Sequence, residues 1–213
     1  MPTLARRTAV LVRRYTRIIH VCAGLYFLLF TWLFSISGLV LNHSRWQFAN
    51  FWPGRAEHVA ELPIVVPAAG PDLATAQALM TQLHISGEVG QVQRHPDQSR
   101  LIVQVTRPGR NVQIDASLDS GRAIVKETTV NAWGVMSALH HFTGVRMDDP
   151  SRPRNWALTW LWTISMDALA AGLIVLVAGG VFLWYTRSAR RAPGLFALVL
   201  GTAACAFFLF GLG

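Results

Sequence analysis

Residues 17–43 read RIIHVCAGLYFLLFTWLFSISGLVLNH, and this stretch decides the fold class. From Ile18 to Leu41 it carries no formal charge. About 20 mostly apolar residues are enough for a helix to cross the ~30 Å hydrocarbon core of a bilayer. The run exceeds the apolar part of a secretory signal peptide, and no small-x-small cleavage site follows it. It therefore predicts an uncleaved transmembrane helix over residues 18–42.

Two further apolar runs lie in the second half of the chain. Residues 156–185 hold a single charge, Asp167, and residues 195–213 hold none. Both runs predict transmembrane helices, of which the last is the shortest. Small residues let membrane helices approach closely, so Gly24 and Gly172 suit helix contact, and the same gaps could instead admit a flat cofactor.

The basic residues predict the orientation of these helices. The formal net charge is +8, from 19 Lys and Arg against 11 Asp and Glu. Eight arginines in residues 1–17 and 186–194, where no acid occurs, account for all of it. By the positive-inside rule both segments are cytoplasmic, and residues 43–155 lie outside. Basic charge that flanks apolar runs indicates a bilayer as the partner and argues against nucleic acid.

The outer region, residues 43–130, combines a connector over 43–70 with a small α+β unit. Residues 71–84 show helical periodicity of apolar residues. Four segments then alternate apolar and polar residues, separated by turn sequences, as in an antiparallel meander: 89–93, 101–106, 112–116 and 123–129. Within residues 131–155, a short helix capped by Asn131 is expected at the membrane interface, followed by a charged loop.

Several short motifs occur in an informative order. RIIH opens the first helix, SGLVLNH closes it, VQIDASLDSGRAI lies in the α+β unit, LHHFTG follows, and Asp167 precedes a W-x-x-R helix end. This order, over about residues 14–190, resembles the PepSY-associated transmembrane (PepSY-TM) family of bacteria. The resemblance implies an inner-membrane protein with a PepSY-like insert. Larger members resemble b-type cytochromes that reduce ferric siderophores, so it also implies haem b between histidines.

Histidines at the membrane spans are the candidate haem ligands, because haem b takes axial imidazoles and a polar ring there is costly. His20 and His43 lie about 34 Å apart along one helix at 1.5 Å per residue, so they cannot share a haem. His43 with His140 is the intrachain pair expected at one membrane face, and His141 is the alternative ligand or a supporting residue. The competing interpretation is structural: His43 caps the first helix and His140 anchors at the headgroups.

Three other residues are expected to support this face. Asp167 either fixes a ligand histidine through its N–H or is tied to Asn42, Arg45 or a backbone group. His20 is either a headgroup-level residue or a functional one. Its functional interpretations are a haem shared with a second copy or another subunit, and a contact to a quinone or donor protein.

Two function classes follow from these patterns. In the first, the chain is a membrane oxidoreductase component that passes electrons to a ferric chelate. It has no GxGxxG fingerprint, so the donor would be external, such as quinol or a redox partner protein. In the second, it is a haem-free accessory or binding protein whose PepSY-like domain engages a periplasmic partner. The absence of CxxCH excludes c-type haem, and no hydrolase motif occurs.

Overall fold

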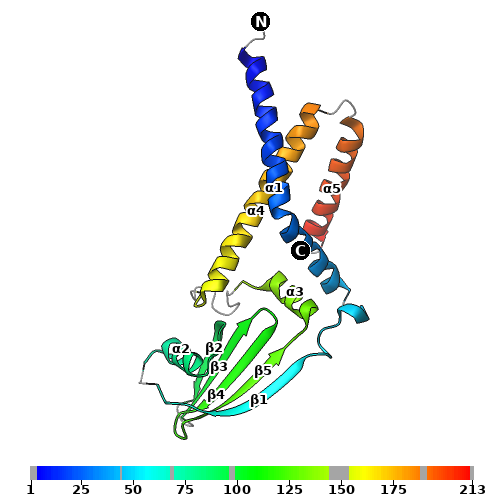
Figure 1. Cartoon of the computed structure of the whole chain (residues 1–213). Coiled ribbons are helices and arrows are strands. Elements are labelled where there is room, and N and C mark those ends of the chain that lie inside the picture. Colours follow the sequence, from blue (N-terminus) through cyan, green and yellow to red (C-terminus); the bar gives the residue numbers. More distant parts are fainter. Residues whose placement is uncertain are drawn as a thin grey trace. The chain divides into compact units, whose positions relative to one another are not determined.

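The computed structural model describes residues 4–43, 45–67, 70–95, 99–143, 154–187 and 191–211 (Figure 1). Among these, three helices are long and apolar enough to cross a membrane: α1 (Leu4–Asn42), α4 (Ala157–Arg187) and α5 (Arg191–Gly211). They confirm the three predicted spanning helices. Most of the predicted loop before α4, and part of the one before α5, lie outside the described residues.

α1 begins at Leu4, well before the predicted start of the spanning helix at residue 18. No Gly or Pro occurs from Leu4 to Ala23, so nothing in the arginine-rich segment interrupts the helix. Its 39 residues extend over about 58 Å at 1.5 Å per residue. This is roughly twice the ~30 Å hydrocarbon thickness, so the basic segment is a helical extension beyond the spanning part.

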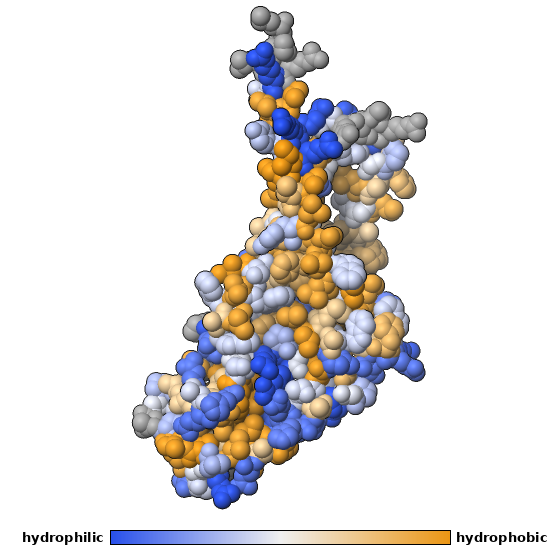
Figure 2. Space-filling model, in the orientation of Figure 1, coloured by the Kyte–Doolittle hydropathy of each residue, from blue (hydrophilic) through white to orange (hydrophobic). Residues whose placement is uncertain are grey.

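Large apolar side chains are exposed along all three of these helices. Leu29 of α1 is 73% exposed, Ile174 of α4 is 72% exposed and Phe210 of α5 is 85% exposed. Figure 2 shows the mainly apolar surface that such residues give to the helices in view. Exposed apolar area of this extent is unfavourable in water and is expected of helices in contact with lipid. The chain is therefore a membrane protein.

The chain divides into two compact units, Met1–Leu29 with Asp167–Gly213, and Phe30–Met166. In the first unit, α1 and α4 meet at small residues. A Cβ at Gly172 would collide with the ring of Phe27, and one at Gly24 would lie 3.8 Å from Leu176 Cδ2. The predicted role of both glycines in helix contact is confirmed.

The second unit contains a five-stranded antiparallel sheet in the order β1-β5-β4-β3-β2. The elements are β1 (Ala56–Pro63), α2 (Asp72–Gln82), β2 (Glu88–His95), β3 (Arg100–Arg107), β4 (Arg110–Ser117) and β5 (Arg122–Thr129). The predicted helix and the four-stranded meander are confirmed. β1 and a short 3-10 turn (η1, Gln47–Ala49) lie within the segment interpreted as a connector. That interpretation missed a strand, because β1 has no clear apolar alternation and is held by pairing with β5.

The core of this unit lies between α2 and one face of the sheet (Figure 1). Leu79 of α2 and Leu101, Val103 and Ile114 of the central strands are fully buried. The opposite face carries ion pairs such as Arg100–Asp115. An antiparallel sheet with one packed and one polar face is the arrangement that the alternating sequence predicts.

The segment before α4 is bound to the edge strand β2 by side-chain hydrogen bonds. The Asn155 side chain accepts from Val89 N at 2.8 Å and donates to Val89 O at 2.9 Å. Buried Glu88 accepts from the backbone N–H groups of Asn155 at 2.8 Å and Trp156 at 3.0 Å. Glu88 thus satisfies donors that would otherwise be free at the N-terminus of α4.

Candidate functional site

Helix α3 (Ala132–His141) carries both histidines of the LHHFTG motif in its last turn. Asn131 caps it as predicted, since its side-chain oxygen accepts a hydrogen bond from Gly134 N at 3.2 Å. Imidazoles in the last turn lie near the negative end of the helix dipole. The helix therefore presents two adjacent rings, whose centroids are 5.2 Å apart.

The half-buried ring of His140 packs against the last turns of α1. Its Nδ1 lies 2.6 Å from Ser37 Oγ, and its centroid lies 5.1 Å from that of Phe34. A Cβ at Gly38 would be in ordinary van der Waals contact with the ring, 3.6 Å from His140 Cε1. The Ser37 hydroxyl also lies 3.1 Å from Phe34 O, so its one proton has two acceptors within reach.

His43 is exposed at the end of α1 and has other partners. Its Nδ1 lies 2.9 Å from Leu39 O, and its ring stacks on Trp46 with centroids 4.4 Å apart. Within the described part of the chain, no hydrogen bond or ring contact joins His43 to His140. The predicted pairing of these two histidines as axial ligands stays a prediction.

His141 lines a cleft of about 450 Å³ between α3, the end of the sheet and the segment after α1. Its Nδ1 lies 3.3 Å from Ser137 O, within its own helix, so Nε2 is the nitrogen left for a ligand. The walls of the cleft are mainly apolar and aromatic, from Leu41, Phe51, Trp52, Val130 and Ala138. The sequence ranks His140 above His141 as a ligand, whereas the cleft contains His141.

Two glycines allow the elements around the cleft to approach each other. Gly109, in the β3–β4 turn, has φ +80°, which favours glycine, and a Cβ there would collide with Val135 of α3. A Cβ at Gly134 would collide with Val130 and lie 3.0 Å from Phe51 Cδ2. The backbone of the β3–β4 turn can therefore pack against the Val135 side chain of α3 at one end of the cleft.

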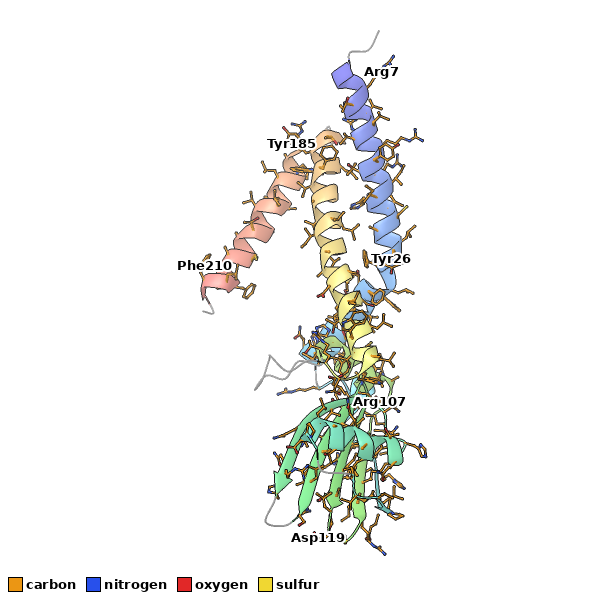
Figure 3. The ribbon with its side chains drawn as sticks, turned by 90° about the vertical axis from the view of Figure 1, so that its left-hand side faces the viewer. Arg7, Tyr26, Arg107, Asp119, Tyr185 and Phe210 are labelled. Atoms are coloured by element: carbon orange, nitrogen blue, oxygen red, sulfur yellow. The ribbon has the colours of Figure 1, made fainter. Side chains whose placement is uncertain are left out.

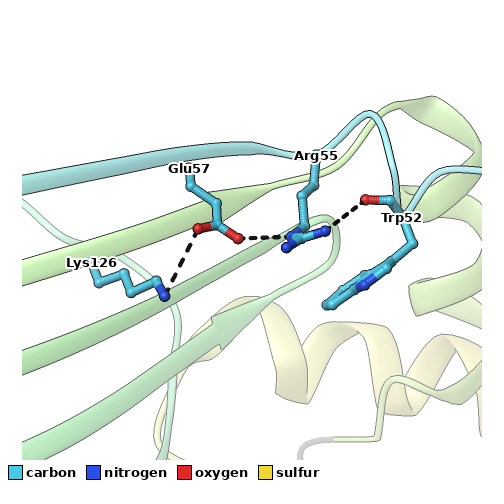
Figure 4. Close-up of polar contacts among 4 residues, drawn as sticks. All are labelled: Trp52, Arg55, Glu57 and Lys126. Carbon is cyan, nitrogen blue, oxygen red and sulfur yellow. Dashed lines mark hydrogen bonds and ion pairs between the residues drawn. The ribbon is translucent and has the colours of Figure 1, made fainter.

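Trp52 is held in place by a chain of polar contacts (Figure 4). The Arg55 guanidinium lies 4.7 Å from the centre of the indole and donates to Trp52 O at 3.2 Å. Arg55 Nε also donates to Glu57 Oε1 at 2.7 Å, and Lys126 Nζ lies 3.8 Å from Glu57 Oε2. The hydrogen bond from Arg55, together with the positive charges of Lys126 and Arg55, lowers the pKa of Glu57 below its ordinary value.

The polar groups of the cleft come from the sheet and from α3. Arg110 forms a two-pronged ion pair with Glu127, in which Nη2 and Oε2 are 2.6 Å apart. Arg107 donates to Ser86 Oγ at 3.2 Å and lies at the end of the sheet opposite Asp119 (Figure 3). Ser137 is 4% exposed, and its Oγ has no hydrogen-bond partner within the described residues. A buried hydroxyl without a partner is costly unless a ligand or water satisfies it.

Sequence reasoning missed the cleft because its walls come from the supposed connector, the ends of the strands and α3, which lie far apart in the sequence. Residues 107–110 (RPGR) are one of the turn sequences between the predicted strands, but the packing of this turn against α3 is not encoded by any local pattern. The one available signal is the concentration of aromatic residues after α1, over residues 46–52. Among the described residues, no group of three or more His, Cys, Asp or Glu side chains gathers as a metal site.

The remaining predicted residues are not among those that line this cleft. Asn42 and Arg45 are exposed and are not among the residues that line it. Asp167 belongs to the other compact unit, so its predicted supporting role stays a prediction. His20 packs on two glycines of α4, where a Cβ at Gly179 would lie 3.4 Å from its Nδ1. That nitrogen is buried and has no hydrogen-bond partner within the described residues.

Comparison with known proteins places the chain in a family. No curated protein and no solved structure matches it. The family described as PepSY_TM-like matches residues 11–210, which covers the three spanning helices and the sheet between the first two. The chain therefore belongs to the PepSY_TM-like family, as a membrane protein with a PepSY-like domain between its first two spanning helices.

Proposed function

We propose that this chain is a membrane-anchored haem b protein that transfers electrons at the side of the membrane carrying the PepSY-like domain. The observation that carries the proposal is His141 in a mainly apolar cleft of about 450 Å³. That volume is within the range of small-molecule pockets, roughly 300–1,000 Å³. In this proposal the chain lies in a bacterial inner membrane with its basic N-terminus in the cytoplasm.

The residues of the cleft suit such a group. An imidazole that hydrogen-bonds a carbonyl through Nδ1 has its ring orientation fixed and its Nε2 left for a metal, and His141 Nδ1 lies 3.3 Å from Ser137 O. Phe51 and Trp52 supply flat apolar walls. Arg107 is the side chain that would pair with a carboxylate at the edge of the ligand, since Arg110 already pairs with Glu127.

When bound, haem b supplies a one-electron iron couple, and the chain's own residues bind and orient it. His141 is the one histidine among the described residues that line the cleft. It would therefore be the residue that holds the haem iron. The donor would be external, such as quinol or a redox partner protein, and the acceptor a ferric chelate.

The test is the absorption spectrum of the full chain, expressed with ample haem and iron and purified in detergent, before and after dithionite reduction. A haem spectrum that is lost in His141→Ala and kept in the control His58→Ala supports the proposal. Loss in His43→Ala or His140→Ala but not in His141→Ala assigns the haem to the other histidines. A colourless wild-type protein overturns the proposal.

A second candidate is a haem-free binding protein, favoured by the partnerless Ser137 hydroxyl in the cleft. Such a ligand would combine a flat apolar body with a hydrogen-bonding group that reaches Ser137. Its signature would be a colourless protein in which a bound small molecule is released on denaturation and identified by mass. Ser137→Val would lower its occupancy, whereas Ser35→Val, on exposed α1 surface, would not.

A further inference from the structure

A groove of about 600 Å³ runs along the N-terminal half of α1 and has no part in the proposed haem site. Seven of its lining positions come from α1 between residues 10 and 22, at alternating spacings of three and one. That spacing places them on one face of the helix. Leu183 of α4 supplies the other wall.

The groove is lined by arginines toward the N-terminus of α1 and by apolar residues further along the helix. Arg13, Arg14 and Arg17 line it together with Ile18 and Val21, which are 47% and 50% exposed. In Figure 2 the hydrophilic residues near this end of α1 lie directly beside apolar ones. The change from arginines to apolar residues occurs where the uncharged run of α1 begins, at Ile18.

The positive charge in the groove is not balanced by the protein. The chain has no acidic residue before Glu57 and none between Asp167 and its end. Within the described residues, none of Arg13, Arg14 and Arg17 forms an ion pair. Like charges three and four residues apart repel each other on a helix, so an anion between them would stabilise this segment.

We propose that this groove binds one anionic phospholipid. The arginines would hold the phosphate groups, since guanidinium matches phosphate with two parallel hydrogen bonds. The acyl chain would lie along Ile18, Val21 and Leu183, which a free phosphate would leave uncovered. A net negative headgroup is favoured over phosphatidylcholine, whose choline cation would meet the same arginines.

The test is lipid binding to the delipidated full chain in detergent, followed by native mass spectrometry. Phosphatidylglycerol should bind at least five-fold more tightly than phosphatidylcholine of the same chain length. One basic residue at an anionic surface contributes ~1 kcal/mol, so Arg14→Gln and Arg17→Gln should each weaken phosphatidylglycerol binding about five-fold. Arg7→Gln removes the same charge from α1 outside the groove and should change binding less than two-fold (Figure 3).

Further arms separate the outcomes. Inorganic phosphate at millimolar concentration should fail to displace the lipid, whereas full displacement would show a phosphate site without an acyl-chain groove and overturn the proposal. Equal binding of the two lipids, or equal effects of Arg7→Gln and Arg17→Gln, also overturns it. Circular dichroism of each variant should match the wild type, because Arg14 and Arg17 are exposed.

Discussion

Glu88→Gln tests whether the sheet caps the second spanning helix. Glu88 is 4% exposed, and its two carboxylate oxygens each accept one backbone N–H, from Asn155 and Trp156. A glutamine keeps one oxygen and turns an NH₂ group toward the other donor. The loss is one charge-assisted hydrogen bond with a part-buried donor left free, or about 2 kcal/mol. That corresponds to an increase of about 30-fold in the opening of this segment.

The assay is hydrogen exchange of the backbone amides from Asn155 through the first turn of α4, measured on the full chain in detergent. Glu61→Gln is the matched control, because Glu61 is 54% exposed and pairs with Arg122 on the surface of the sheet. An exposed pair contributes ~0.2–1 kcal/mol and does not touch α4. If Glu88→Gln changes the exchange of these amides no more than Glu61→Gln does, the capping interpretation is wrong.

Three further predictions concern packing, a buried hydrogen bond and acid stability. Gly172→Leu should lower the thermal unfolding temperature through its collision at the α1–α4 contact, whereas Gly201→Leu, with open space around it, should not. Ser37→Ala removes the hydroxyl that lies 2.6 Å from His140 Nδ1 and should cost ~1 kcal/mol in denaturant unfolding. An unchanged free energy of unfolding would show that this contact is not a hydrogen bond. Because its pKa is lowered, the Glu57 carboxylate stabilises the folded state above the ordinary pKa of 4.5. This stabilisation is lost as pH falls through the pKa of the folded protein. The unfolding temperature of Glu57→Gln should therefore fall less between pH 6 and pH 3 than that of the wild type. An equal fall in the two proteins would contradict this.

Most of the elements follow from patterns that are local in the sequence. Uncharged runs of sufficient length predict the spanning helices, and apolar alternation predicts the strands of the meander. β1 does not follow in this way, because its residues are exposed on nearly every position and its conformation comes from pairing with β5. The register of that pairing, Ala56 with Thr129 through Pro63 with Arg122, joins segments that no local signal relates.

The candidate site was predictable in its histidines but not in its shape. The LHHFTG motif and the Asn131 cap locate His140 and His141 on one short helix. Which ring meets α1 and which meets the cleft depends on the packing of α3 against Ser37 and the β3–β4 turn. Those contacts join residues about 100 and 26 positions apart in sequence, and only the folded chain supplies them.

The amide of Asn155 has a consequence for how copies of the chain can associate. It hydrogen-bonds both backbone groups of Val89, so it occupies the start of β2 as another strand would, and a bulge follows between Val89 and Val92. The opposite edge, β1, pairs with β5 alone among the described strands. Continuous edge-to-edge pairing of sheets from many copies needs two open edges on each sheet. Pairing through a single open edge joins only two copies. Addition of a further strand is therefore disfavoured at the start of β2, where Asn155 already takes the place of a neighbour.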